Sequence, residues 1–195
     1  MPSEKDRLYV ALYARGGMPK MPGLEDTLRR AVKTDIPRYH WALVVGPKKE
    51  SRNNIGSVFN AKERLTIAGD PPALRSVWEY EERDAAAGTT SMLLVRVLVA
   101  KVRDVRRLRD IFEATPLRPD THGWNCVAWV REALVAAMDD GRALGTCARD
   151  WKSVRNTAMW YIRVKKAVHR FDGSVSFDPD KVATWNMLER SEIEP

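Results

Sequence analysis

The chain has 195 residues, of which 44% are hydrophobic and 30% are charged, and its formal net charge is +7 with a sequence pI of about 9.6. These values are typical of one soluble globular domain, and no apolar run approaches the ~18 residues that a membrane-spanning helix needs. The chain has two cysteines, too few for a disulfide framework, and its N-terminus lacks the uninterrupted apolar run of a signal peptide, so we expect a reduced, cytoplasmic protein.

The first half of the chain contains most of the strand signals. Runs rich in Val, Leu, Ile and Tyr, bounded by Gly, Pro and polar clusters, predict strands at 7–16, 39–47, 57–67, 76–84 and 92–102. The fifth run, "MLLVRVLVAKV", is apolar on both faces apart from Arg96, so we expect it in the centre of a sheet. A short amphipathic helix is predicted at 24–33, and the polar run "KKESRNNIG" predicts a hairpin loop.

The second half is predicted to be helical over 104–115, 125–138 and 150–171, where apolar residues recur at spacings of three and four. Asp104 and Asp150 are suited to cap two of these helices. Strands first and helices later indicate the α+β class, with an antiparallel sheet of about five strands packed against the helices. We expect one domain over 1–171 and a C-terminal extension, 172–195, that docks on it.

The stretch "GWNCVAWV" places Cys126 at the first turn of a predicted helix. The helix dipole and the free N–H groups of a first turn favour a thiolate, and the backbone N–H of Cys126 can contribute to an oxyanion hole. We therefore expect Cys126 to have a pKa below that of a free thiol if it is a nucleophile. The alternative is that Cys126 fills space in the core, as free cysteines often do.

A nucleophilic thiol needs a base, and the chain has three histidines. His122 lies four residues before Cys126, in a loop from which it can approach the thiol, although histidines in loops are usually solvent-exposed. His169 lies in a basic stretch suited to the surface. His40 is the polar exception in the apolar run "YHWALVV", so it needs a buried hydrogen-bond partner. A hairpin from 39–47 to 57–65 brings Asn60 beside His40, where the amide oxygen can fix the tautomer of the imidazole ring.

These residues carry a resemblance to a known fold. A His in an early strand, a polar residue in the next strand and a later "NC" that opens a helix resemble the circularly permuted papain-like fold, shared by lecithin:retinol acyltransferase-like enzymes and by some thiol peptidases that remove ubiquitin or its relatives. The resemblance covers about half of the chain. It implies an acyl-transfer site in which Cys126 attacks a carbonyl, His40 shuttles the proton and Asn60, where those enzymes more usually have His, orients the ring.

We further expect Asn125 and Trp124 to support the oxyanion side of the site and Trp41 and Trp129 to line a pocket. The whole chain also resembles a group of small proteins of filamentous fungi in which a "YHWAL…GP" strand and a "WNC.WV" helix occur together. That likeness implies no activity.

The sequence leaves other functions open. A binding module without turnover fits the seven Trp, which could line a ligand pocket. A nucleic-acid binder fits five basic residues of the last long helix: Lys152, Arg155, Arg163, Lys166 and Arg170. We nevertheless expect Trp151 and Trp160 to pack in the core rather than stack on bases. We expect no cofactor and no metal, because the Cys and His residues lack ligand spacing. The expected partner is a small-molecule or peptide substrate. Cys147 is predicted in a loop, neither catalytic nor disulfide-bonded.

Overall fold

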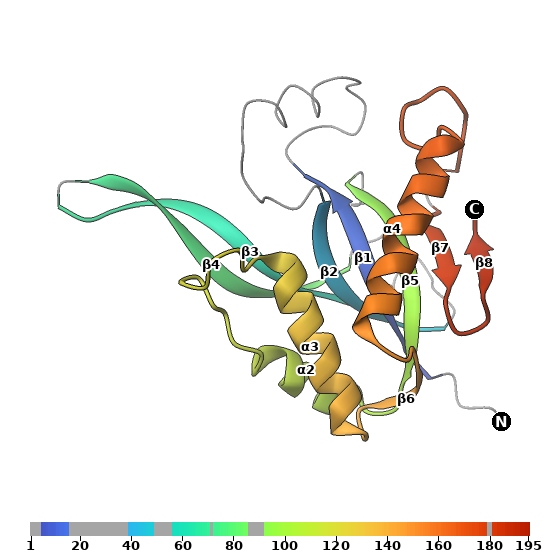
Figure 1. Ribbon diagram of the computed structural model, residues 1–195, viewed down its shortest axis with the longest axis horizontal. Helices are drawn as coiled ribbons and strands as arrows, with labels where there is room; N and C mark the ends of the chain where they lie inside the picture. The colour runs from blue at the N-terminus through green and yellow to red at the C-terminus, as the bar shows by residue number, and fades with distance from the viewer. Residues whose placement is uncertain (1–4, 16–38, 49–55, 71, 86–91, 179–180) are drawn as a thin grey trace.

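The computed structural model describes residues 5–15, 39–48, 56–70, 72–85, 92–178 and 181–195 (Figure 1). The helix expected at 24–33 and most of the expected hairpin loop lie outside these residues. Eight strands of the described part form one sheet, in the order β4-β3-β2-β1-β5-β7-β8, with β6 also paired to β5. The strands are β1 (Arg7–Ala14), β2 (Tyr39–Gly46), β3 (Ser57–Ala68), β4 (Ala73–Asp84), β5 (Leu93–Val102), β6 (Leu144–Cys147), β7 (Ala183–Asn186) and β8 (Ser191–Glu194).

The α+β class is confirmed, and the sheet is larger than the five strands expected. All pairs are antiparallel except β5 with β7, which is parallel. The additional strands β6, β7 and β8 come from the second half of the chain, where short four-residue strands give little periodic signal. The C-terminal segment thus contributes β7 and β8 to the same sheet.

The expected central strand is central: β5 lies between β1 and β7. Arg96, the charged residue in the interior of β5, is buried. Its Nε donates to Thr184 Oγ1 on β7 at 2.8 Å, which compensates for part of the cost of burial. The guanidinium also lies over the ring of Tyr9, 4.6 Å from the ring centroid. A buried cation needs such partners, and here they come from both neighbouring strands.

Three described helices lie on one face of the sheet: α2 (Val105–Glu113), α3 (Cys126–Asp140) and α4 (Trp151–Ala167) (Figure 1). Each begins at a polar cap, because Asp104, Asn125 and Asp150 accept hydrogen bonds from backbone N–H groups of their first turns. The two Asp caps are those expected from the sequence. None of the helices in these described ranges is long and apolar enough to cross a membrane.

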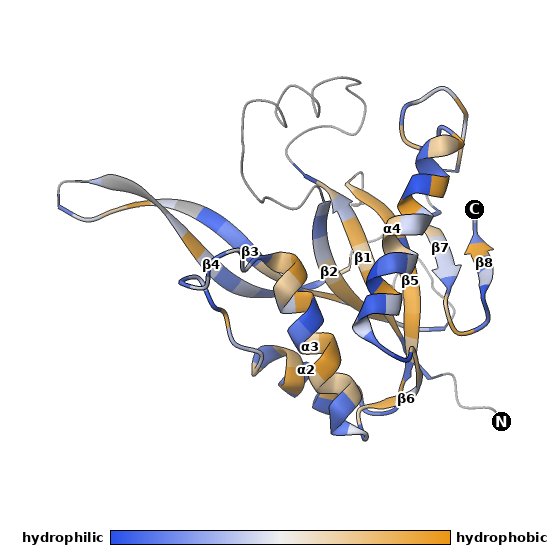
Figure 2. Cartoon of the chain, viewed as in Figure 1, coloured by the Kyte–Doolittle hydropathy of each residue, from blue (hydrophilic) through white to orange (hydrophobic). Residues whose placement is uncertain are grey.

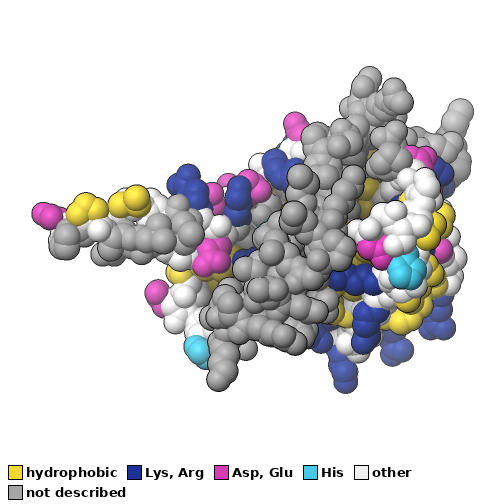
Figure 3. Space-filling view, turned by 90° about the horizontal axis from the view of Figure 1, so that it is seen from above, with side chains coloured by type: hydrophobic (Ala, Val, Ile, Leu, Met, Phe, Trp, Pro, Cys, Tyr) yellow, Lys and Arg dark blue, Asp and Glu magenta, His cyan; other side chains and the backbone are white. Residues whose placement is uncertain are grey.

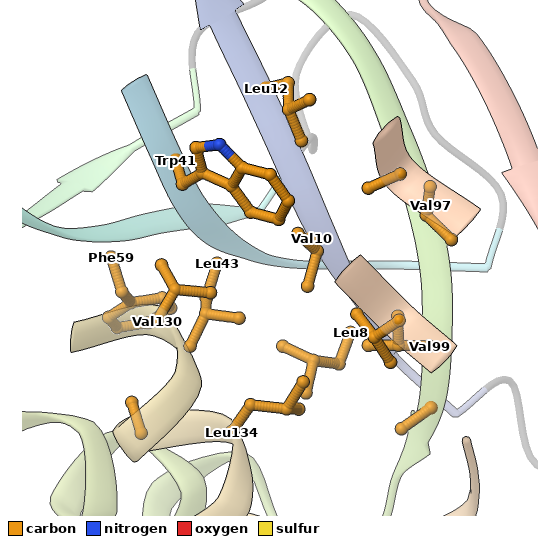
Figure 4. Packing of buried hydrophobic residues seen from close by; sticks show 14 of the residues in the cluster. Leu8, Val10, Leu12, Trp41, Leu43, Phe59, Val97, Val99, Val130 and Leu134 are labelled. Atoms are coloured by element: carbon orange, nitrogen blue, oxygen red, sulfur yellow. The ribbon is translucent and has the colours of Figure 1, made fainter. Parts of the chain in front are cut away.

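The alternation of side chains along the strands divides the core into two clusters. The helix face of the sheet and the apolar sides of α3 and α4 form the larger cluster, and in Figure 2 the central strands of the sheet are coloured mainly as hydrophobic. In Figure 4, Trp41 and Leu43 of β2 lie on the same side of the sheet as Val130 of α3. The opposite face carries a smaller buried cluster: Tyr9, Ala11, Tyr13, Ala42, Val44, Val58 and Leu98.

Two expectations for the second half need correction. Trp160 was expected in the core, but it is 42% exposed and packs edge-on against Trp185, with centroids 4.9 Å apart. Trp151 is half-buried against Trp41. Cys147 was expected in a loop, but it ends β6 and pairs with Ala100.

The strands β3 and β4 form a long arm that extends beyond the rest of the sheet (Figure 1). They pair with each other over their full length, from Ser57 with Asp84 to Ala68 with Ala73. In contrast, β2 pairs with β3 only at Val45, Val44 and Leu43. From Asn60 onward β3 therefore leaves β2, and the sheet opens between these two strands.

Candidate active site

The turn before α3 fixes the position of Cys126. Gly123 adopts a left-handed φ of +74°, Asn125 caps the helix by accepting from Val127 N at 2.9 Å, and Cys126 is the first helical residue. The Cys126 side chain is fully buried and belongs to the cluster on the helix face. The sequence motif thus places the thiol at a capped helix N-terminus, as expected, but inside the core.

The opening between β2 and β3 contains a chain of three polar side chains. His40 Nε2 lies 3.0 Å from the Oδ1 of Asn60, and Asn60 Nδ2 donates to the carboxylate of Glu81 at 3.1 Å. Asn60 is only 2% exposed, and it pairs directly with Glu81 across the β3–β4 hairpin. The antiparallel pair of β2 and β3 therefore brings Asn60 beside His40, as the sequence predicted.

This network fixes the tautomer of His40. An ionised carboxylate only accepts hydrogen bonds, so the Asn60 amide must present its NH₂ group to Glu81 and its oxygen to His40. Glu81 is ionised, because bonds from Asn60 and Lys62 outweigh its partial burial and lower the pKa of its carboxyl. His40 Nε2 therefore carries the proton, and Nδ1 is left as the acceptor that a general base requires.

Cys126 and the side chain of His40 lie on opposite faces of β2. The sulfur of Cys126 faces the backbone N–H of Trp41, the residue that follows His40. His40 lies on the same face of β2 as Ala42 and Val44, which belong to the cluster opposite the helices. Within the described residues no hydrogen bond joins the sulfur to the His40 ring, so the structure brings His40 and Asn60 together but holds Cys126 against the main chain beside them.

Burial dominates the protonation of both groups. It raises the pKa of the Cys126 thiol, against the backbone N–H of Trp41 and the positive charge of Arg15, which lower it. Burial also lowers the pKa of His40, although the bond to Asn60 acts in the other direction. This direction is opposite to the lowered pKa expected of a nucleophilic Cys126, because desolvation outweighs the N–H groups and the charge that favour the thiolate. The resting groups are a neutral thiol and a neutral imidazole.

The expected supporting residues have mainly structural contacts. Besides capping α3, Asn125 donates to Gly123 O at 3.1 Å. Trp124 is buried edge-on against Trp78, and its indole Nε1 has no hydrogen-bond partner among the residues described. Trp41 and Trp129, expected to line a pocket, both pack in the core on the helix face.

The remaining candidates lie apart from this network. His122 is exposed in the turn before α3, and His169 is exposed and bonded to Asp172 at 2.6 Å. The two cysteines are both free. No group of three or more His, Cys, Asp or Glu side chains in the described ranges is arranged to hold a metal ion. A surface depression between α2 and α3, lined by residues such as Thr115 and Val135, is built from other residues than the His40 network.

Of the five basic residues proposed for nucleic acid, three are exposed on α4 and two have local partners. Lys166 lies over the ring of Tyr39, 5.3 Å from its centroid, and Arg170 donates to the backbone oxygen of Lys181 at 2.8 Å. The exposed ones are Lys152, Arg155 and Arg163.

Sequence reasoning missed two residues of the site, Glu81 and Arg15. Glu81 is one of several acidic residues in "EYEERD", and only the hairpin register shows that it faces Asn60. Arg15 follows the first strand, and its position near Cys126 depends on the order of strands in the sheet. Neither had a sequence signal of its own.

Comparison with known proteins gives a family but no activity. No curated protein and no solved structure matches the chain. One family model matches residues 5–194, which is nearly the whole sequence. The chain therefore belongs to DUF6914, a family of unknown function.

Proposed function

We propose that the chain is a cysteine-dependent acyl-transfer enzyme, an amide, ester or thioester hydrolase or an acyltransferase, on a circularly permuted papain-like fold. Cys126 is the nucleophile, His40 is the general base and Asn60 orients His40. The observation that carries this proposal is the chain of hydrogen bonds from His40 through Asn60 to Glu81, together with a cysteine at a helix N-terminus whose sulfur faces the backbone N–H of Trp41, the residue after His40. A His whose Nε2–H is held by an amide oxygen keeps its Nδ1 available to take a proton.

The neutral state of both groups determines how the step runs. His40 and Cys126 lie on opposite faces of β2, so the mechanism requires the His40 ring to turn toward the sulfur at the open end of the strand. The thiol proton then passes to His40 Nδ1 as the sulfur attacks the acyl carbonyl carbon, and the carbonyl π pair moves to oxygen. The oxyanion is stabilised by the Cys126 N–H, which as a first-turn amide has no partner within the helix ladder. His40 then returns the proton to the leaving group, and water or another nucleophile releases the acyl group from sulfur.

Access to the thiol is the main requirement of this mechanism. The Cys126 side chain has no exposed surface, so the groups around its sulfur must move apart before an acyl donor can reach it. Such opening at loops and element ends is common in enzymes and sets many turnover rates.

Acyl-enzyme formation is the direct test. The protein is incubated with p-nitrophenyl acetate, and intact-mass and peptide mass spectrometry locate the acetyl group. We expect acetylation at Cys126, its loss in Cys126→Ala, a decrease of at least about 100-fold in His40→Ala and a smaller decrease in Asn60→Ala. Cys147→Ala is the matched control and should acetylate at the wild-type rate. Absence of an adduct at Cys126, or an adduct that forms equally fast without His40, would overturn the proposal.

A second candidate is a binding module on the same fold that has no turnover. The observation that favours it is the complete burial of Cys126 together with its raised pKa, which is typical of a structural cysteine. The binding module predicts no acetylation of the folded protein at Cys126 and no effect of His40→Ala. The acetylation experiment therefore separates the two candidates.

A further inference from the structure

The end of strand β2 is crossed by an ion pair. Ala14, the last residue of β1, pairs with Tyr39, and Arg15 follows it. Glu63 lies on β3 beyond Phe59, where β3 no longer pairs with β2. Arg15 Nη2 lies 3.5 Å from the carboxylate of Glu63, so its side chain reaches from β1 past the end of β2 to β3.

This position puts one cation beside both groups of the proposed site. The positive charge of Arg15 lowers the pKa of the Cys126 thiol and also that of His40. The sheet is open here, because β3 has already separated from β2. Arg15 therefore lies at the open end of β2, with Cys126 on one face of this strand and the His40 side chain on the other.

The bond that holds Arg15 is weak enough to exchange. The side chains of Arg15 and Glu63 are 26% and 36% exposed, and ion pairs with this exposure contribute little to stability. A guanidinium has five N–H donors arranged to bind a carboxylate with two parallel hydrogen bonds. A substrate carboxylate can compete with Glu63 for Arg15 at little cost.

Two further groups favour an anion on the same side. Arg83 adds positive charge near His40 and Tyr13, while its own partner Glu81 is 3.6 Å away. Tyr13, which is 6% exposed and pairs with His40 across β1 and β2, has the Arg83 guanidinium beside its hydroxyl. The hydroxyl oxygen can accept from Arg83, which leaves the O–H of Tyr13 to donate to an anion.

We propose that Arg15 is a substrate-binding residue that recognises an anionic group, a carboxylate, on the acyl substrate of Cys126. This inference rests on the proposed function, because it assigns the substrate class of the same site. In the free protein Glu63 occupies Arg15, and the substrate carboxylate replaces Glu63 when it binds. The acyl donors favoured by this site carry a carboxylate near the reacting carbonyl.

The test compares an anionic with a neutral alkylating reagent, iodoacetate with iodoacetamide, on protein with Cys147→Ala so that only Cys126 reacts. Both reagents attack the same thiolate, so the ratio of their rates reports on anion attraction and not on the thiol pKa. We expect the iodoacetate-to-iodoacetamide ratio to fall about fivefold in Arg15→Gln and to rise in Glu63→Gln, which releases Arg15. Arg64→Gln is the matched control, because Arg64 pairs with Glu79 on the arm, and it should leave the ratio unchanged.

A second measurement does not depend on thiol reactivity. NMR titration of the His40 ring should give a higher pKa in Arg15→Gln than in the wild type, because a nearby positive charge is removed. If the thiol reacts but the iodoacetate-to-iodoacetamide ratio is unchanged in Arg15→Gln, or if the His40 pKa is unchanged, the role of Arg15 is overturned and the proposed function is not. A thiol that reacts with neither reagent at any pH overturns the proposed function, and the substrate inference falls with it.

Discussion

His40 and Asn60 are 20 residues apart in the sequence, yet the ring Nε2 of His40 donates to the amide oxygen of Asn60 at 3.0 Å. The bond forms at the point where β3 leaves β2, so a side-chain contact replaces the backbone pairing that ends at Leu43 and Phe59. Because Glu81 holds the other end of the amide, Asn60 cannot rotate without losing both bonds. The ring of His40 is thereby fixed in one tautomer before any substrate binds.

Replacing Asn60 with Ala should lower the pKa of His40. The bond from Nε2–H to Asn60 opposes the effect of burial, so its removal leaves desolvation less balanced. Asn60→Asp should have the opposite effect, because a carboxylate beside the ring stabilises the imidazolium. NMR titration of the ring measures both, and a His40 pKa that rises in Asn60→Ala would contradict the bonding described above.

The same shift predicts a loss of stability in acid. The folded protein holds His40 with a pKa below its unfolded value of about 6.5, so the folded state binds fewer protons than the unfolded state as the pH falls through that range. The contribution of His40 to stability is therefore present above about pH 6.5 and is lost as the pH falls toward the folded pKa. Urea unfolding at pH 7.5 and pH 5.5 should show a smaller acid loss in His40→Gln than in the wild type.

The local parts of this site could be predicted from the sequence, and its protonation could not. A polar residue in each of two strands that follow one another in the sequence is enough to predict that Asn60 lies beside His40. The "NC" motif likewise predicts the start of a helix at Cys126. The pKa of Cys126 depends on how completely the sheet and helices cover it, which is a property of the assembled core. The contact of Arg15 with Glu63 could not be predicted either, because it depends on the order of the strands in the sheet.

Gly56 should tolerate no larger residue. Its φ is +102°, and a Cβ added there would lie 1.8 Å from the backbone oxygen of Val45. Gly56→Ala must therefore distort the start of β3 where it pairs with β2, and it should lower the free energy of unfolding by more than about 1 kcal/mol. Gly173→Ala is a useful control, because Gly173 also has a positive φ but nothing lies within 4 Å of its Cβ position. Urea unfolding of both variants checks this; an equal loss in both would mean that φ alone, and not the contact with Val45, determines the cost.

The C-terminal hairpin is held to α4 by a cluster of three polar side chains, of which Tyr161 and Lys165 are buried and Glu192 is exposed. Glu192 on β8 accepts from the Tyr161 hydroxyl at 2.6 Å and pairs with Lys165 at 2.6 Å, and Lys165 is only 5% exposed. Burial alone would raise the pKa of the Glu192 carboxyl, but bonds from Lys165 and Tyr161 outweigh it and lower the pKa.

Tyr161→Phe keeps the ring and removes the hydroxyl, so it should cost about 1.5 kcal/mol of unfolding free energy. Lys165→Met should also lower the free energy of unfolding, because it removes the bond from the buried Lys165 ammonium to Glu192. The loss in both variants should appear first as faster hydrogen exchange in residues 183–194, since these strands depend on the cluster. Unchanged exchange there would show that the pairing of β7 with β5 alone holds the hairpin.

Alkylation of Cys126 against pH is the sharpest test of the resting state. Burial raises the pKa of the thiol, so the rate of reaction with iodoacetamide, measured in Cys147→Ala, should increase with pH and show its midpoint above the ~8.5 of a free cysteine. In denaturing urea, where the core no longer covers the sulfur, the midpoint should return to the ordinary value. The sign for stability follows: between the unfolded and the folded pKa the unfolded state binds fewer protons, so stability falls as the pH rises above about 8.5, and Cys126→Ala should reduce that alkaline loss. A midpoint below 8.5 in the folded protein would show that the first-turn N–H groups and Arg15 outweigh burial, and that Cys126 rests as a thiolate.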